Sequence, residues 1–327
     1  MRVVVLEEPG RFGIVSRDAP IESQVDVLVR VHRVGVCGTD LHAYAGRQPF
    51  FDYPRVLGHE LAVEVLQASR ESGLSPGNMC AVEPYLTCAK CSACLADRNN
   101  CCEQMQVLGV HVDGGMAPIM NIPANLLHQS SKLSLDQLAL VETLGIGAHA
   151  VARADLHGDE RVLVVGAGPI GLAVTQFAML TGTEVHVLEI SEARREFVSR
   201  FGADARDDIG GSKYDVVFDA TGNQNAMQKS FGFLEQGAKL IFAGFIQGEI
   251  TFDDTEFHRR EVTLMSSRNS TNQFPRIIEL IESGRVDTSP WITHRMTLAE
   301  VAEDFASLPQ SAGLIKAMVT VEDSDVY

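Results

Sequence analysis

The chain has 327 residues, of which 45% are hydrophobic and 21% charged, and its formal net charge is −16. These proportions are typical of a globular protein, and the length exceeds the usual size of one compact core, so we expect two domains. The acidic balance excludes a nucleic-acid-binding surface, which needs a basic footprint, and disfavours binding to an anionic membrane. The first residues lack the basic head and apolar core of a signal peptide, so we expect a cytoplasmic protein.

The N-terminal part of the chain, to about residue 122, is rich in β-branched residues and turns. Its apolar patterning predicts strands over Asp26–Gly38 and His59–Ala68. Cys37 ends the first predicted strand, and His59 and Glu60 begin the second; all three have side chains of zinc-binding type. Each one alone also fits an ordinary buried cysteine or a hydrogen-bonded histidine, so their spacing leaves the metal site open.

Five of the seven cysteines lie in one polar stretch, CAKCSACLADRNNCC, at residues 88–102. Cys88, Cys91, Cys94 and Cys102 have the spacing C-x2-C-x2-C-x7-C, which places four thiolates within reach of one ion. Four cysteines with no open position are typical of a structural zinc site, and a reducing cytosol disfavours a disulfide knot. A redox cluster stays as the alternative, and Cys101 is left over.

The apolar segment ALVETLGIGAHA follows the cysteines and carries Glu142. A buried carboxylate without a partner is costly, so its place among apolar residues favours a functional role. We therefore regard Glu142 as a fourth candidate ligand beside Cys37, His59 and Glu60.

From Glu160 onward, short apolar strands alternate with amphipathic helices, which is typical of a parallel, doubly wound sheet. The predicted strands are Arg161–Gly168, Glu184–Ile190, Tyr214–Gly222, Ala238–Phe245 and Val262–Ser267. The predicted helices are Pro169–Gly182, Ser191–Ala203 with Ser191 as its N-cap, and Phe274–Gly284. The tail adds a predicted helix, Thr297–Leu308, and a predicted strand, Ile315–Val321.

The first of these strands runs into a glycine-rich turn, GAGPIG, and then into a helix. Gly166, Gly168 and Gly171 form the pattern G-x-G-x-x-G, with Pro169 and Ile170 between the last two. The first glycine permits a tight turn, the second lets the backbone approach a pyrophosphate, and the third lets helix pack on strand. In this strand–turn–helix context the pattern indicates dinucleotide binding.

The end of the next predicted strand carries Glu189, 18 residues after Gly171. A carboxylate there accepts hydrogen bonds from ribose hydroxyls and repels a 2′-phosphate, so NAD is favoured over NADP. Arg194 and Arg195 follow closely and keep NADP as the alternative. A flavin or another nucleotide is less favoured.

Six segments together resemble the zinc-dependent medium-chain dehydrogenase/reductase family of the alcohol dehydrogenase superfamily. They are GVCGTDLH, YPRVLGHE, CAKCSACLADRNNCC, GVHVDGGMAPI, LVETLGIGAHA and VVGAGPIG, which occur in the family's order almost from end to end. The resemblance implies an α/β fold, with a GroES-like β-rich catalytic domain at residues 1–147 and 286–327 and a Rossmann NAD-binding domain at 148–285. It also implies a homo-oligomer, either a dimer or a tetramer.

By position, the resemblance places Cys37, His59 and Glu60 on the ligands of a catalytic zinc, and Thr39 and His42 on a proton relay. In the cysteine stretch it assigns Cys88, Cys91, Cys94 and Cys102 to a structural zinc and leaves Cys101 outside. Glu142 falls where simple alcohol dehydrogenases have a second cysteine, and a glutamate at this position resembles the polyol and threonine dehydrogenase branches. Which glutamate binds zinc stays open, and about two zinc ions per chain are expected.

The glutamate-containing site points to a polyol, a sugar acid or an amino alcohol, whose secondary alcohol would give a hydride to NAD with zinc as a Lewis acid. GRQPFFDYPRVLGHE and SSRNST most resemble sugar-acid dehydrogenases of the L-galactonate/L-gulonate 5-dehydrogenase type. An acidic protein needs local cations to bind an aldonate, so Arg47, Arg55 and Arg268 are substrate candidates, with Phe50 and Asn269. These arginines equally fit ordinary surface ion pairs.

Three other functions stay as alternatives. One is an L-threonine 3-dehydrogenase or another alcohol dehydrogenase. The second is a zinc-free reductase acting on quinones or enones, and the third is a non-catalytic NADPH-binding protein. Candidates for every catalytic role disfavour the last two.

Overall fold

The computed structural model of the chain describes residues 1–21, 23 and 25–326. They form two compact units. The first unit comprises Met1–Glu142, Phe274–Gly284 and Thr288–Tyr327, and the second comprises Thr143–Gln273 and Arg285–Asp287. The ranges expected from the sequence differ from these units mainly in Phe274–Gly284, which belongs to the first unit. No helix in the described ranges has the length and apolarity needed to cross a membrane.

The second unit is built on a parallel sheet with the strand order β12-β11-β10-β13-β14-β15. Its strands are β10 (Arg161–Val165), β11 (Glu184–Leu188), β12 (Asp204–Arg206), β13 (Tyr214–Asp219), β14 (Leu234–Phe242) and β15 (Thr263–Ser266). The order reverses between β10 and β13, which is the switch point where doubly wound sheets bind nucleotides. The sequence-based expectation of an α/β doubly wound sheet is confirmed.

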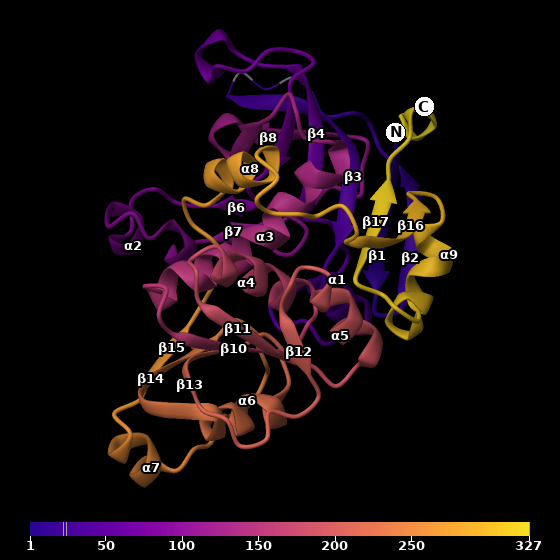
Figure 1. Ribbon diagram of the computed structural model, residues 1–327. Helices are drawn as coiled ribbons and strands as arrows, with labels where there is room; N and C mark the ends of the chain where they lie inside the picture. Colours follow the sequence, from indigo (N-terminus) through magenta and orange to yellow (C-terminus); the bar gives the residue numbers. More distant parts are fainter. Residues whose placement is uncertain (22, 24, 327) are drawn as a thin grey trace. The chain divides into compact units, whose positions relative to one another are not determined.

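Helices cover this sheet because the strands of a parallel sheet are apolar on both faces. They are α4 (Pro169–Met179), α5 (Glu192–Ser199), α6 (Gln224–Ser230), α7 (Asp254–Arg259) and a short 3-10 helix, Phe231–Phe233. Figure 1 shows α4 and α6 on opposite faces of the sheet. Ser191 occupies the expected N-cap position of α5, but its side chain makes no capping hydrogen bond.

The first unit is mainly antiparallel, with the sheet order β16-β17-β3-β4-β5-β9, and β8 pairs with β3. Its strands are β1 (Arg2–Glu8), β2 (Arg11–Ser16), β3 (Asp26–Val36), β4 (Glu60–Gln67), β5 (Met79–Val82), β6 (Tyr85–Leu86), β7 (Gln106–Val107), β8 (Ile119–Pro123), β9 (Leu127–Gln129), β16 (Ile292–Thr297) and β17 (Lys316–Thr320). The alternation of buried and half-buried residues in β3 is typical of a strand with one face on the core.

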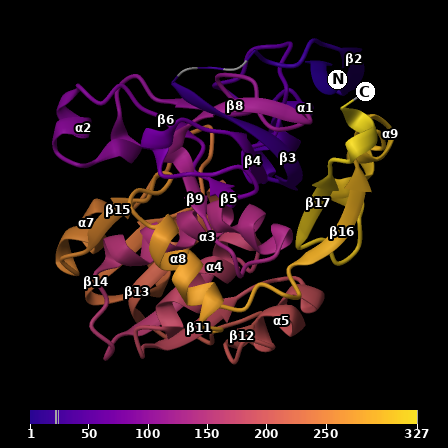
Figure 2. The same cartoon turned by 90° about the horizontal axis from the view of Figure 1, so that it is seen from above.

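Short helices connect the strands of the first unit. They are α1 (Gly38–Tyr44), α2 (Ser92–Leu95), α8 (Phe274–Glu282), α9 (Val301–Asp304) and 3-10 helices at Arg70–Ser72, Asn99–Cys101, Ala124–Leu126, Phe305–Gln310 and Asp323–Asp325. The longer helix α3 (Leu135–Ala154) begins in the first unit and continues into the second. In both views the segment that carries α2 projects from the side of the first unit, and the two chain ends lie side by side (Figures 1 and 2).

The expected helix Thr297–Leu308 is wrong at its start. Thr297 is the last residue of β16, and the helical segment begins only at Val301. Thr297 pairs with Thr320 of β17, which holds it in the sheet, and a turn at residues 298–300 separates it from the helical segment. After Asp304 the chain tightens into a 3-10 helix that contains Pro309.

Candidate functional site

The end of β3 and the short helix α1 place the first group of candidate residues. Cys37 is the N-cap of α1; its amide donates to Asp40 Oδ2 at 2.8 Å, which fixes the turn. Its Sγ donates to Thr39 Oγ1 at 3.7 Å. His42 lies three residues after Thr39 on the same helix, so the two side chains share one face. Burial, and then Arg47, lower the pKa of His42.

The pairing of β3 with β4 brings the second group beside the first. Gly35 and Glu60 are directly opposite each other in the antiparallel register. As a result, ligand atoms of Cys37, His59 and Glu60 lie within 4.8 Å of one another. Gly35 makes this arrangement possible, because a Cβ atom at that position would lie 2.0 Å from Glu60 Oε2.

Lys316, at the start of β17, forms a buried ion pair with Glu60. Its Nζ donates to Glu60 Oε1 at 2.6 Å and to Oε2 at 2.8 Å, and both side chains are almost fully buried. Burial opposes the charge on Lys316, but Glu60 and then Cys37 outweigh it and raise the pKa of Lys316. The ammonium thus balances a carboxylate that would otherwise be a lone buried charge.

His59 and Asp40 lie side by side in the buried part of the cluster. His59 Nδ1 lies 3.8 Å from Asp40 Oδ1, and both buried atoms lack a hydrogen-bond partner among the described residues. Burial opposes the charge on His59, but Asp40 and Cys37 outweigh it and raise its pKa well above the usual value. A buried imidazole beside a cysteine sulfur, with a carboxylate facing its other nitrogen, has the neighbours that metal-ligating histidines show. The donor set therefore fits a zinc ion.

Glu142 reaches the same region from α3. Its Oε1 accepts a hydrogen bond from the Tyr85 hydroxyl at 2.6 Å, in a buried position. Burial raises the pKa of Glu142, and His59 opposes that shift. Glu142 does not belong to the group of Cys37, His59 and Glu60, whose ligand atoms lie within 4.8 Å of one another. It lies beside that group.

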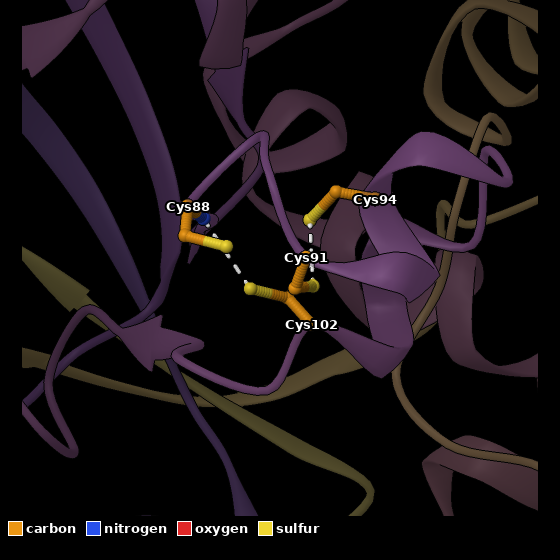
Figure 3. A group of neighbouring side chains, drawn as sticks. All are labelled: Cys88, Cys91, Cys94 and Cys102. Carbon is orange, nitrogen blue, oxygen red and sulfur yellow. Dashed lines mark hydrogen bonds between the residues drawn. The ribbon is translucent and has the colours of Figure 1, made fainter.

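The four expected cysteines form a second cluster, shown in Figure 3. Their Sγ atoms lie within 4.8 Å of one another, and those of Cys91 and Cys94 are 3.5 Å apart. Two thiolates on a tetrahedral zinc ion are about 3.8 Å apart, from a Zn–S distance of about 2.3 Å. All seven cysteines are free thiols, and Cys101 is exposed and lies outside the cluster, whereas Cys102 is buried within it.

The pKa values of these thiols are also compatible with the binding of a metal cation. Backbone amides of Glu103 and Cys94 lower the pKa of Cys91 to about 6, so its thiolate forms near neutral pH. Desolvation and the contact with Cys91 raise the pKa of Cys94 to about 12. The cluster thus holds both a thiolate and a proton that a bound metal ion would displace.

In the second unit, the three glycines of the turn differ in what surrounds them. Gly166 has a φ of +94°, which favours glycine, and a Cβ atom on Gly171 would lie 1.9 Å from the Gly166 carbonyl oxygen. Among the described residues, a Cβ atom on Gly168 would meet no atom within 4 Å. Contacts with these residues therefore do not require glycine at 168, and the open position fits the approach of a pyrophosphate. Pro169 and Ile170 begin α4 behind it.

Glu189 is buried directly after β11, and its carboxylate accepts hydrogen bonds from two backbone amides. Oε2 accepts from Ala167 at 2.7 Å and Oε1 from Ser191 at 2.8 Å. It therefore stiffens the glycine turn and the start of α5, and each oxygen keeps a second lone pair for a ribose hydroxyl. Arg195 donates to the Glu189 carbonyl at 2.8 Å, whereas Arg194 is half-exposed on α5.

The substrate candidates lie in both units. Arg47 and Phe50 follow α1 in the first unit, where the Phe50 ring stacks 6.5 Å from that of His111. Arg268 and Asn269 follow β15 in the second unit, and Asn269 has a φ of +52°. Arg55 lies 3.6 Å from Asp113, so for this residue the ordinary ion pair is the observed arrangement.

Three residues of the first cluster were missed by sequence reasoning: Asp40, Tyr85 and Lys316. Asp40 lies inside GVCGTDLH, where a capping carboxylate three residues after Cys37 was a usable signal. Lys316 and Tyr85 gave no local signal, because their partners lie 256 and 57 residues away in sequence.

Comparisons with known proteins agree with this architecture. The family model of the alcohol dehydrogenase GroES-like domain matches residues 23–132, and that of the zinc-binding dehydrogenases matches 169–283. The chain is 38% identical to L-galactonate-5-dehydrogenase of Escherichia coli K12, over 98% of this chain and 99% of that protein.

Two solved structures are also similar along their whole length. One is an alcohol dehydrogenase of Escherichia coli CFT073 complexed with NADH, with 26% identity, a TM-score of 0.91 and coverage of 98% and 99% of the two chains. The other is a zinc-binding dehydrogenase of Sinorhizobium meliloti 1021 bound to NADP, with 27% identity, a TM-score of 0.90 and 98% of each chain covered. The chain therefore belongs to the zinc-dependent medium-chain dehydrogenase/reductase family, whose members bind zinc and a nicotinamide cofactor.

Proposed function

We propose that the protein oxidises a secondary alcohol of a polyol or sugar acid, an aldonate in particular, with NAD as hydride acceptor. The observation that carries this proposal is the cluster of Cys37, His59 and Glu60, in which the histidine and the glutamate are buried. Glu142, at the position where simple alcohol dehydrogenases have a second cysteine, lies beside this cluster, and a glutamate there favours a polyol or sugar acid over a simple alcohol. The end-to-end similarity to L-galactonate-5-dehydrogenase supports a sugar acid.

Each side chain of the cluster has a distinct role in this proposal. Cys37, His59 and Glu60 would hold the catalytic zinc, which would supply a Lewis acid for the substrate hydroxyl, and the nicotinamide would accept the hydride. Thr39 accepts a hydrogen bond from that hydroxyl and passes the proton to His42, one helical turn further on. Glu142, beside the cluster, is proposed as the alternative acceptor of that proton.

The other sites complete the proposal. Cys88, Cys91, Cys94 and Cys102 hold a structural zinc, which makes about two zinc ions per chain. The turn from Gly166 to Gly171 holds the pyrophosphate, and the Glu189 carboxylate disfavours the 2′-phosphate of NADP, so we favour NAD. Arg47, Phe50, Arg268 and Asn269 are proposed to contact the substrate. A cytoplasmic location and a homo-oligomer stay predictions.

The test is a steady-state survey of five- and six-carbon polyols, aldonates and L-threonine, with NAD and with NADP, on protein whose zinc content is measured. We expect the highest kcat/KM for an aldonate or polyol with NAD, and about two zinc ions per chain. Turnover of L-threonine alone would reject the sugar-acid substrate. Full activity and zinc content in Cys37→Ala or His59→Ala would reject the catalytic metal site.

A further inference from the structure

Tyr85 is in contact with both proposed metal sites of the first unit. It lies on the short strand β6, three residues before Cys88, and it is 5% exposed. Its hydroxyl donates to Glu142 Oε1 at 2.6 Å. Its ring packs in a small apolar cluster with Cys102 and Met105, and the other three cysteines pack against that cluster.

The backbone around Tyr85 is held by the segment that leaves the cysteine lobe, residues 88–102. Tyr85 pairs with Val107 in the β6–β7 ladder, and the Leu108 amide donates to the Pro84 carbonyl at 3.1 Å. At the entrance of the lobe, the Cys88 amide donates to Cys102 Sγ at 3.3 Å (Figure 3). The segments that enter and leave the lobe are therefore paired with each other, and Tyr85 is part of this pairing.

The lobe has little apolar interior of its own to stabilise this pairing. Within the part of the chain that the structure describes, the cluster around Tyr85 contains two other buried residues, Cys102 and Met105. The helix α2 is a single turn, and Leu95 on it is exposed. A metal ion that joins four thiolates supplies the cross-link that such a small loop-rich segment needs.

We propose that Tyr85 is a positioning residue through which the metal-closed lobe sets the orientation of Glu142 at the catalytic site. The inference rests on the proposed function, because it needs Glu142 beside the catalytic metal. Packing against the lobe holds the Tyr85 ring in place. The position of the ring fixes the hydroxyl, whose hydrogen bond orients one carboxylate oxygen of Glu142. A structural metal site would then affect turnover without touching substrate.

The test compares Tyr85→Phe, which keeps the ring and removes the hydroxyl, with Cys102→Ser, which removes one lobe ligand, and with the double variant. We expect Tyr85→Phe to lower kcat roughly tenfold with little change in KM, since misplaced catalytic groups cost turnover. The double variant should lose no more than the more damaging single change, because both changes act through one path. Met105→Ala loosens the ring without removing a ligand, and replaces Cys102→Ser if that protein does not fold.

A second readout does not depend on activity. Cadmium alone, bound to the metal-free protein, gives separate NMR resonances for an all-sulfur site and for a mixed site with Cys37, His59 and a carboxylate. Tyr85→Phe should shift the mixed-site resonance and leave the all-sulfur resonance in place. Tyr214→Phe is the matched control, because Tyr214 is a buried tyrosine of the second unit whose hydroxyl lies 2.9 Å from His186 Nδ1. Cys101→Ser is the control for the lobe.

The outcomes separate the two proposals. A wild-type protein with no turnover of polyols or aldonates, or without the mixed-site resonance, rejects the proposed function. If the wild type has both, but Tyr85→Phe changes neither kcat nor the mixed-site resonance, the coupling is rejected. Multiplicative losses in the double variant also reject it, since they show independent actions. Equal losses in Tyr214→Phe would show a general effect of removing a buried hydroxyl.

Discussion

At the scale of single residues, the pair of Glu60 and Lys316 sets the electrostatics of the candidate catalytic site. Both side chains are at most 2% exposed, and both carboxylate oxygens contact the ammonium. A buried ion pair gains little net stability over apolar residues, because both charges lose their hydration. Removing one partner is different, since it leaves a lone charge in the interior. The pair is therefore better explained by a need for a carboxylate at this place.

The residue-scale prediction is that Lys316→Met lowers the free energy of unfolding of the metal-free protein by about 3–5 kcal/mol, the cost of an unpaired buried charge. Urea unfolding measures this change. Zinc should reduce the loss if Glu60 is a ligand, because the ion replaces the missing positive charge.

The control is Lys132→Met. Lys132 pairs with Glu282 at 3.2 Å, but its side chain is 70% exposed, so the loss should stay below about 1 kcal/mol. Equal losses in the two variants would contradict the role given to burial. A loss in Lys316→Met that zinc leaves unchanged would count against Glu60 as a ligand.

At the scale of elements, the turn between β10 and α4 contains glycines that the fold requires and one glycine that is available for ligand binding. Gly171 packs the helix on the turn, and any side chain there would overlap the Gly166 carbonyl. Gly168 has a φ of −72° and open space around it, so alanine fits its backbone. The same motif therefore contains positions with different physical requirements.

The element-scale prediction is that Gly168→Ala keeps or slightly raises stability, by up to about 1 kcal/mol, but weakens NAD binding about tenfold or more. Gly171→Ala should instead lower the melting temperature. Thermal unfolding and calorimetric titration with NAD measure the two effects. Unchanged NAD affinity in Gly168→Ala would place the pyrophosphate elsewhere.

The sequence predicted most of these elements because their signals are local. The strand–turn–helix of the glycine loop and the spacing of the four cysteines are each contained in a short segment. The start of the helix at Val301 was missed, since Thr297 belongs to β16 through its pairing with the distant strand β17. Tyr85 and Lys316 were missed because a contact between distant segments exists only in the folded chain.

At the scale of the whole molecule, the first unit is assembled from both ends of the chain. The C-terminal strand β17 pairs with β3, and Asp136 at the start of α3 links the two regions. Its carboxylate lies 3.0 Å from Arg33 Nε and 2.5 Å from Arg295 Nη2. Partial burial opposes its charge, but Arg295 and Arg33 outweigh it and lower the pKa of Asp136 below the usual 3.8.

This shift predicts a pH dependence of stability. The folded protein binds a proton at Asp136 less readily than the unfolded chain, so this contribution is complete above about pH 4 and is lost as the pH falls through the lowered pKa. Asp136→Asn should cost about 1 kcal/mol at pH 7, with a difference from wild type that disappears in acid. Urea unfolding between pH 7 and pH 3 measures it.

Asp323→Asn is the comparison, because Asp323 pairs with Arg30 but is 82% exposed. It should change stability by less than about 0.5 kcal/mol at every pH. A loss in Asp136→Asn that stays constant into acid would show that the carboxylate's charge is not the cause.

The placement of Lys316 also has a consequence for how the protein is made. A ribosome adds roughly 5–20 residues per second, so Lys316 emerges roughly 13–51 s after Glu60, from which 256 residues separate it. The second unit, up to Gln273, is synthesised in that interval and can fold first. The Glu60 carboxylate meanwhile lacks its counter-charge, and β3 lacks its neighbour β17. A chain truncated before Lys316 would thus lack both the ammonium that balances Glu60 and the strand that pairs with β3.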